Sequence, residues 1–201
     1  MITDVSRRAQ LERRTRETSI VVAVNVDGTG QADVQTGIGF LDHMLDAIAR
    51  HGMFDLTVRA EGDLSVDSHH TAEDVAILMG RAFDQALGDR RGITRIAHAY
   101  APLDEALALA VIDISGRGHA EIDAPMREPM LGTLDADMVR HFFVSFAVEA
   151  KLTLHGQVLS GDNGHHRAEA LFKAFARALD AATRIDLRLG DAVPSTKGTL
   201  G

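Results

Sequence analysis

Two short motifs combine residue types that bind metal ions, because each holds two adjacent histidines and a glutamate in the spacing HHxxE. The motifs comprise His69, His70 and Glu73, and His165, His166 and Glu169. Each motif lies at the start of an apolar segment with helical periodicity, where positions i and i+4 share one face. The first histidine and the glutamate of each motif can therefore bind one ion, whereas the second histidine points about 100° away.

The two motifs are 96 residues apart, and similar segments surround them in the same order. A histidine also occurs early in the apolar segment before each motif, at His43 in the first half and at His141 in the second. This repetition indicates an internal duplication in which the two halves exchange ligands. We expect one site with His69, Glu73, His141 and His166, and another with His43, His70, His165 and Glu169.

Three imidazoles and one carboxylate suit Mn, Fe, Zn or Ni and leave positions open for a substrate. The chain has no cysteine, which excludes a thiolate site. A single HHxxE motif is weak evidence for a metal site, but two copies, each preceded by a histidine in a similar place, are hard to obtain by chance. His51, His98, His119 and His155 have no such pattern, and we interpret the last three as residues without a metal role.

Segments with strand-like and helix-like patterns must position these side chains. β-Branched runs predict strands, and apolar periodicity followed by glycine predicts helices. The expected strands are residues 17–26, 31–36, 54–60 and 152–159 with two more within 106–123, and the expected helices are 40–51, 70–87, 136–150 and 165–184. The stretch "NVDGTG" is similar to a phosphatase motif, but Asn25 stands where the first aspartate would be. Its Asp-Gly pair predicts a hairpin turn at 27–30.

Each half is expected to follow the order β-β-β-α-β-α, which makes the fold class α+β with an internal duplication. The predicted packing is two antiparallel sheets, each covered on one face by its pair of helices. Residues 1–91 would form the first repeat and residues 92–190 the second, together making one compact domain. Residues 191–201 form a tail with almost nothing to bury, and we expect this tail to be disordered when it has no partner.

The composition indicates a globular protein that acts on a small molecule. Of the 201 residues, 45% are hydrophobic and 25% are charged, and the formal net charge is −8. The acidic excess gives no electrostatic basis for binding nucleic acid or an anionic membrane surface. Scarce aromatic residues and the lack of any apolar run of about 20 residues argue against base stacking and against a membrane span. We expect a cytoplasmic protein without a signal peptide.

Several motifs, taken in order, resemble one known family over nearly the whole chain. "RRTRETSI", "FLDHMLDAIARHG", "DSHHTAED", "PLDEALALAVIDISGRG", "DNGHHRAEALFKAFARALDAA" and "PSTKG" together resemble imidazoleglycerol-phosphate dehydratase of histidine biosynthesis. The resemblance implies a fold of two β-β-β-α-β-α repeats and a homo-oligomeric 24-mer, with two Mn²⁺ ions in each active site between subunits. Its ligand pattern assigns His43, His70, His165 and Glu169 to one ion, and His69, Glu73, His141 and His166 to the other.

The resemblance also implies the reaction, which removes water from D-erythro-imidazole-glycerol phosphate and gives imidazole-acetol phosphate. The proton at C2 has no adjacent carbonyl to acidify it, so a metal-bound imidazolate would expel the C3 hydroxyl through a diazafulvene-type intermediate. Glu17 is the expected acid/base residue, and Asp104 is a second candidate for a catalytic role.

Cations would hold the phosphate of this substrate, because arginine and lysine are its usual partners. The resemblance places Arg95, Arg117, Lys173, Ser195, Thr196 and Lys197 there. We expect the tail to become ordered when substrate binds. The other residues expected to contact the substrate are Glu17, His43, His51, His69, His70, Glu73, His165 and Glu169.

Two other functions would also explain the metal ligands. A di-metal hydrolase would use a metal-bound water to attack a phosphoester or an amide, and a metal-storage or scaffold oligomer would have no catalytic activity. The hydrolase does not account for the tail or for the extent of the family resemblance. A saturable anion site formed by Arg95, Arg117 and Lys197 would contradict the storage function.

Overall fold

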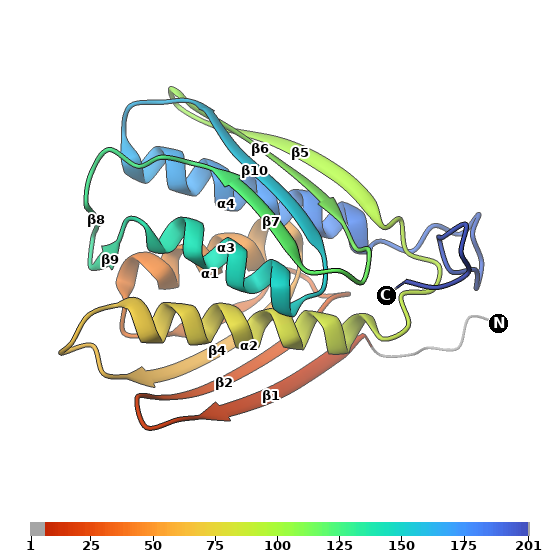
Figure 1. Ribbon diagram of the computed structural model, residues 1–201, viewed down its shortest axis with the longest axis horizontal. Coiled ribbons are helices and arrows are strands. Elements are labelled where there is room, and N and C mark those ends of the chain that lie inside the picture. The colour runs from red at the N-terminus through yellow and green to blue at the C-terminus, as the bar shows by residue number, and fades with distance from the viewer. Residues whose placement is uncertain (1–6, 201) are drawn as a thin grey trace.

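The computed structural model describes residues 7–200 and has two four-stranded sheets on the outside with four helices between them (Figure 1). In order across the first sheet lie β1 (Arg8–Arg14), β2 (Thr18–Asn25), β4 (Asp55–Gly62) and β3 (Ala32–Gln35). In the second sheet lie β5 (Ile96–Leu103), β6 (Ala106–Asp113), β10 (Thr153–Ser160) and β7 (His119–Asp123). The two halves of the chain therefore build matching sheets.

The helices form the two inner layers of the molecule. They are α1 (Gly39–Gly52), α2 (His69–Leu87), α3 (Met138–Glu149) and α4 (Gly164–Thr183). The helices α1 and α2 contact the first sheet, α3 and α4 contact the second, and across the middle α1 contacts α4 and α2 contacts α3. Each helix therefore lies between its own sheet and a helix of the other half, which lets side chains from the two halves meet. None of the described helices is both long and apolar enough to cross a membrane.

The expected α+β fold is confirmed, and the repeated order of elements and strands is consistent with an internal duplication. Every helix and strand with a predicted range is present, and its ends lie within two residues of the prediction. The strands β1 and β5 have no predicted range. A short hairpin of β8 (Met130–Leu131) and β9 (Leu134–Asp135), which precedes α3, is also unexpected.

Neither sheet is purely antiparallel, so this part of the prediction is wrong. The strand β4 lies between β2 and β3 and pairs in parallel with β3, and β10 lies between β6 and β7 and pairs in parallel with β7. The turn at 27–30 is therefore not a hairpin. Asp55, at the start of β4, ties this turn to the inserted strand by accepting hydrogen bonds from the backbone N–H groups of Thr29 (2.8 Å) and Gln31 (3.2 Å).

Phenylalanine side chains hold the inner helical layers together. The ring of Phe83 on α2 lies 5.4 Å from that of Phe146 on α3, and the ring of Phe143 on α3 lies 4.6 Å from that of Phe172 on α4. All four rings are buried. Each buried phenylalanine contributes about 1.5–3 kcal/mol of hydrophobic stabilisation, so this cluster fixes the relative positions of the helices that carry the HHxxE motifs.

Gly80 sets the distance between α2 and α3. A Cβ at this position would lie 2.6 Å from the backbone oxygen of Phe146 and 2.9 Å from the backbone nitrogen of Ala150. Because backbone atoms of a packed helix cannot move aside easily, we expect Gly80→Ala to lower the free energy of unfolding by about 1–3 kcal/mol. Chemical denaturation of the metal-free protein measures this change. Gly39→Ala is the control, since a Cβ at Gly39 has no neighbour within 4 Å, and equal stability of the two variants would contradict the expected clash.

Candidate metal centre

His43 on α1 meets His165 and Glu169 on α4, and we call these three residues the α1–α4 cluster. Each offers one ligand atom, and these atoms lie within 4.8 Å of one another. The Oε2 atom of Glu169 is 3.1 Å from Nε2 of His43 and 3.0 Å from Nε2 of His165. Asn163 caps α4 by accepting a hydrogen bond from the backbone N–H of His166, which stabilises the helical turn that carries the motif.

His69 and Glu73 on α2 meet His141 on α3, and we call these residues the α2–α3 cluster. Their ligand atoms also lie within 4.8 Å of one another. The Nε2 atom of His141 is 2.8 Å from Oε1 of Glu73, and the rings of His69 and His141 lie 4.9 Å apart. The two clusters are therefore built in the same way: one half gives a histidine and a glutamate one turn apart, and the other half gives a histidine.

Each cluster contains three of the four ligands in a predicted set. Within one chain, His43 of the first half joins the two ligands of the second half, and His141 of the second half joins the two ligands of the first. The second histidine of each motif, His70 or His166, joins neither cluster. Among residues 7–200, a single chain therefore completes neither four-ligand set.

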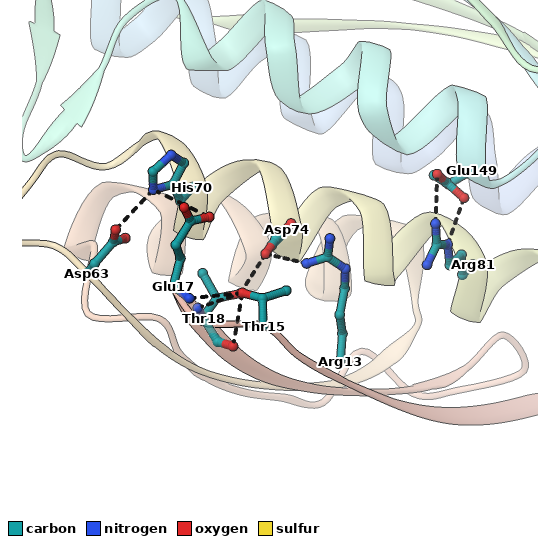
Figure 2. A network of polar contacts seen from close by, with 9 residues as sticks. All are labelled: Arg13, Thr15, Glu17, Thr18, Asp63, His70, Asp74, Arg81 and Glu149. Carbon is teal, nitrogen blue, oxygen red and sulfur yellow. Dashed lines mark hydrogen bonds and ion pairs between the residues drawn. The ribbon is translucent and has the colours of Figure 1, made fainter.

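His70 faces two carboxylates (Figure 2). Its Nδ1 atom is 3.0 Å from Oδ2 of Asp63 and 3.9 Å from Oε2 of Glu17. Both carboxylates line a hollow of about 460 Å³ between the β1–β2 turn and the end of β4. Glu17 lies in the turn before β2 and not in the predicted strand. Asp63 is not among the predicted site residues, because it matches no motif and lies in a loop.

His166 has a similar environment in the second half. Its Nδ1 atom is 2.8 Å from Oε2 of Glu105, and its Nε2 atom is 3.9 Å from Oδ2 of Asp104. Both acidic residues lie in the turn between β5 and β6, where Asp104 has a φ of 46°. Asp104 is a predicted site residue and Glu105 is not, although the two are adjacent in the motif "PLDEAL".

The turn that presents Glu17 is anchored to α2 (Figure 2). Within this turn, Thr15 Oγ1 accepts hydrogen bonds from the backbone N–H groups of Glu17 (3.1 Å) and Thr18 (2.9 Å). The carboxylate of Asp74 on α2 accepts hydrogen bonds from the side chains of Arg13 and Thr18. Because these contacts lie on both sides of Glu17, they hold it next to the HHxxE motif of α2.

Charge and hydrogen bonding keep two glutamates of the site ionised. Burial alone would raise the pKa of Glu169, but hydrogen bonds from Lys173 and His43 outweigh it and lower the pKa to about 2. The backbone N–H of Asn163 and the side chain of His166 lower the pKa of Glu105 to about 2. An ionised carboxylate is the form that binds a metal ion, so Glu169 could bind one at neutral pH without further deprotonation.

Lys173 and His51 are the predicted substrate contacts that lie near the α1–α4 cluster. The Nζ atom of Lys173 is 2.6 Å from Oε1 of Glu169. Burial lowers the pKa of His51, and the positive charges of Lys173 and Arg177 lower it further. A neutral His51 and a cationic Lys173 therefore extend the site along α1 and α4.

Arg95 and the tail lie together, away from both clusters. The Nη1 atom of Arg95 donates a hydrogen bond to the backbone oxygen of Pro194 (2.7 Å), and its Nε atom donates to Asp113 (2.7 Å). The backbone N–H of Gly92 also donates to the oxygen of Ala192 (3.0 Å). Residues 191–194 are thus held without any ligand, which differs from the expected disorder. The physical reason is that Gly92 and Arg95, in the loop before β5, donate hydrogen bonds to the backbone of the tail.

Apart from Lys173, the predicted phosphate contacts are too far from the α1–α4 cluster to act on the same bound molecule within one chain. The backbone N–H of Arg95 donates to the oxygen of Ala182, near the end of α4, whereas His165 lies at its beginning. The intervening 17 residues of helix span about 25 Å. Arg117, in the turn after β6, and the segment 195–197 lie at the Arg95 end of the second sheet, and Figure 1 shows the tail at the end opposite the starts of α2 and α4.

Comparisons with known proteins agree over most of the chain. Residues 36–179 match the imidazoleglycerol-phosphate dehydratase family. The chain is 58% identical to the imidazoleglycerol-phosphate dehydratase of Roseiflexus sp. (strain RS-1), covering 97% of this chain and 98% of that protein. It is 60% identical to the protein of the same name from Chloroflexus aurantiacus, covering 96% and 95%.

Two solved structures are similar in fold and in sequence. The imidazoleglycerol-phosphate dehydratase of Staphylococcus aureus has a TM-score of 0.81 and 34% identity, covering 89% of this chain and 99% of that one. The enzyme of Pyrococcus furiosus in complex with (S)-C348 has the same TM-score and identity, covering 94% and 100%. The family match, over residues 36–179, spans both HHxxE motifs of this chain.

Proposed function

The chain belongs to the imidazoleglycerol-phosphate dehydratase family, which makes it a dehydratase of histidine biosynthesis acting on a small molecule, and from this premise we propose how its residues carry out the reaction. The substrate is D-erythro-imidazole-glycerol phosphate, and the product is imidazole-acetol phosphate. Two Mn²⁺ ions are held at sites completed by a second chain. The observation that carries the proposal is that each three-residue cluster lacks the fourth ligand of its set.

The clusters suit a divalent transition metal. The distances from histidine Nε2 to glutamate oxygen are 2.8, 3.0 and 3.1 Å. Adjacent ligands around an octahedral ion with bonds of about 2.1 Å lie about 3.0 Å apart. Imidazole and carboxylate ligands with an open position are typical of Mn and related metals. The α1–α4 cluster would hold one ion and the α2–α3 cluster the other.

The fourth ligands come from neighbouring chains in this proposal. His70 of one chain completes the α1–α4 cluster of another, and His166 completes an α2–α3 cluster. Because Glu17 lies beside His70, and Asp104 beside His166, each histidine brings an acidic residue into the shared site. The family's 24-mer is an assembly in which every chain gives and receives such ligands.

The cytoplasmic location that we expect for this protein also stays a prediction.

Manganese would supply Lewis acidity to the imidazole ring, so that the ring can lose its N–H proton and drive out the C3 hydroxyl. The chain's own residues handle the remaining protons and charges. The carboxylate of Glu17 removes the C2 proton, and Asp104 is the weaker candidate for this work. Lys173 lies next to Glu169 and faces the substrate from the same chain, whereas His51 borders the site in its neutral form.

The phosphate is held by a chain other than the one that gives the cluster. Arg95 and Arg117 supply the positive charges together with Lys197, and the hydroxyl groups of Ser195 and Thr196 add hydrogen bonds. This follows from the separation of about 25 Å along α4. Arg95 already holds Pro194, so the start of the tail is fixed beside one of the proposed phosphate-binding residues.

Titrating Mn²⁺ into metal-stripped protein tests this function directly. Formation of imidazole-acetol phosphate and particle size are followed together. We expect activity and a large assembly to appear near two equivalents of Mn²⁺ per chain, because each chain carries two clusters and binding only to the assembled form stabilises it. Assembly without product formation would contradict the assigned reaction and favour the metal-storage function, whereas hydrolysis of a phosphoester would favour the hydrolase.

A further inference from the structure

His70 and His166, which join neither cluster, each have the same kind of contact. Nδ1 of His70 is 3.0 Å from a carboxylate oxygen of Asp63, and Nδ1 of His166 is 2.8 Å from one of Glu105. Neither carboxylate belongs to a predicted ligand set or to the predicted acid/base pair. Figure 2 shows the Asp63 carboxylate directed at the ring of His70.

The hydrogen bond is made by different elements in the two halves, although Glu17 in the β1–β2 turn also lies 3.9 Å from Nδ1 of His70. Asp63 follows β4 directly, whereas Glu105 lies in the turn between β5 and β6. The counterpart of β4 in the second half is β10, and the counterpart of the β5–β6 turn is the β1–β2 turn. A duplicated backbone alone would place the carboxylates at matching positions. In both halves a carboxylate hydrogen-bonds to Nδ1 of this histidine, although the two carboxylates occupy non-matching positions.

A carboxylate on Nδ1 determines which nitrogen of the ring can bind a metal ion. An ionised carboxylate only accepts hydrogen bonds, so Nδ1 carries the proton and Nε2 of the neutral ring keeps its lone pair. In both clusters, Nε2 is the histidine atom that faces the glutamate, as in His43, His141 and His165. The orientation of His70 and His166 thus leaves the same atom available.

We propose that Asp63 and Glu105 are positioning residues that hold the rings of His70 and His166 so that Nε2 of each meets a metal ion in a neighbouring chain. Histidines that bind metal commonly donate their other N–H to a carboxylate, which fixes the ring and makes the ligand more basic. The inference rests on the proposed function, because it requires ions shared between chains. It adds two residues to that function that no ligand pattern identifies.

Asp63 allows the sharper test of the two. Glu105 also accepts hydrogen bonds from the backbone N–H groups of Asp162 (3.1 Å) and Asn163 (3.0 Å), so its replacement would disturb the loop before α4. The side chain of Asp63 contacts His70 through Oδ2, while Oδ1 is buried without a hydrogen-bond partner among the described residues. Asp63→Asn keeps the shape and can still accept a hydrogen bond, and Asp63→Ala removes the acceptor.

The experiment measures Mn²⁺ affinity and stoichiometry of the assembled enzyme by titration in metal buffers. We expect one of the two sites per chain to weaken by about 10-fold in Asp63→Asn and by about 100-fold in Asp63→Ala. The other site should keep its affinity. His70→Ala should lose the affected site altogether. Asp33→Asn is the control, because it removes the same charge from an exposed ion pair with Arg59, and it should bind both ions as the unmodified protein does.

The possible outcomes separate this inference from the function on which it rests. If both Asp63 variants bind two ions with unchanged affinity while His70→Ala loses one, the positioning role is wrong and the shared metal site stands. If His70→Ala itself binds both ions normally, the ligand assignment is wrong and the positioning role falls with it. The proposal is supported if only one site loses Mn²⁺ affinity and if Asp63→Ala weakens that site more than Asp63→Asn does. A general loss of stability would instead weaken both sites together.

Discussion

Replacing Glu169 by glutamine is expected to lower kcat by at least about 1,000-fold, equivalent to about 4 kcal/mol of activation free energy. Oε2 of Glu169 faces the Nε2 atoms of both histidines of the α1–α4 cluster, and Oε1 faces Lys173. The amide keeps the size of the side chain but removes the negative charge that a divalent ion requires. We therefore expect the variant to retain one Mn²⁺ per chain instead of two.

Metal analysis and steady-state kinetics on the same sample measure this effect. Glu121→Gln on β7 is the matched control, because Glu121 is exposed on a strand and the replacement removes the same charge. A Glu169→Gln variant that keeps both ions and its turnover would contradict the assignment of this cluster. If added Mn²⁺ restored both the metal content and the turnover, the loss would lie in affinity, and Glu169 would still be a ligand.

The helices and most strands could be predicted because their signals are local. Apolar periodicity and a following glycine define α1 and α2 in the sequence, and a β-branched run defines β2. The strands β1 and β5 escaped prediction because each is an edge strand with a single buried residue, Ala9 or Ala101. The parallel pairing of β3 with β4 and of β7 with β10 was not predicted either. It depends on where β4 and β10 insert into the sheets.

The candidate site was predictable to the extent that it follows helix geometry. The i, i+4 relation places His69 with Glu73 and His165 with Glu169, and both pairs lie together in the structure. The same geometry gives the direction in which the His70 side chain points, but it does not give the residues that surround this side chain. Asp63 could not be identified, because a lone aspartate in a loop carries no signal of the contacts it makes. The proposed sharing of ligands between chains could not be predicted from helix geometry either, because it would depend on packing between folded chains.

Mixing two inactive variants is expected to restore activity, because His70 lies outside the α1–α4 cluster of its own chain. His70→Ala keeps an intact cluster, and His165→Ala keeps an intact His70. If subunits of the two variants mix at random without metal, a site is complete only where the cluster comes from one variant and His70 from the other. With equal amounts, this holds for about a quarter of the sites, since every chain in a symmetric oligomer gives and receives the same contact.

The measurement is turnover after the metal-free variants are mixed and Mn²⁺ is added, compared with each variant alone. His165→Ala mixed with Glu169→Gln is the decisive control, because both changes damage the same cluster and every chain in that mixture lacks a working one. That mixture should stay inactive. If the His70→Ala mixture also stayed inactive although its subunits had exchanged, His70 would act within its own chain and the shared site would be wrong. Recovery in the first mixture alone requires a ligand that crosses between chains, and such a ligand would couple metal binding to assembly.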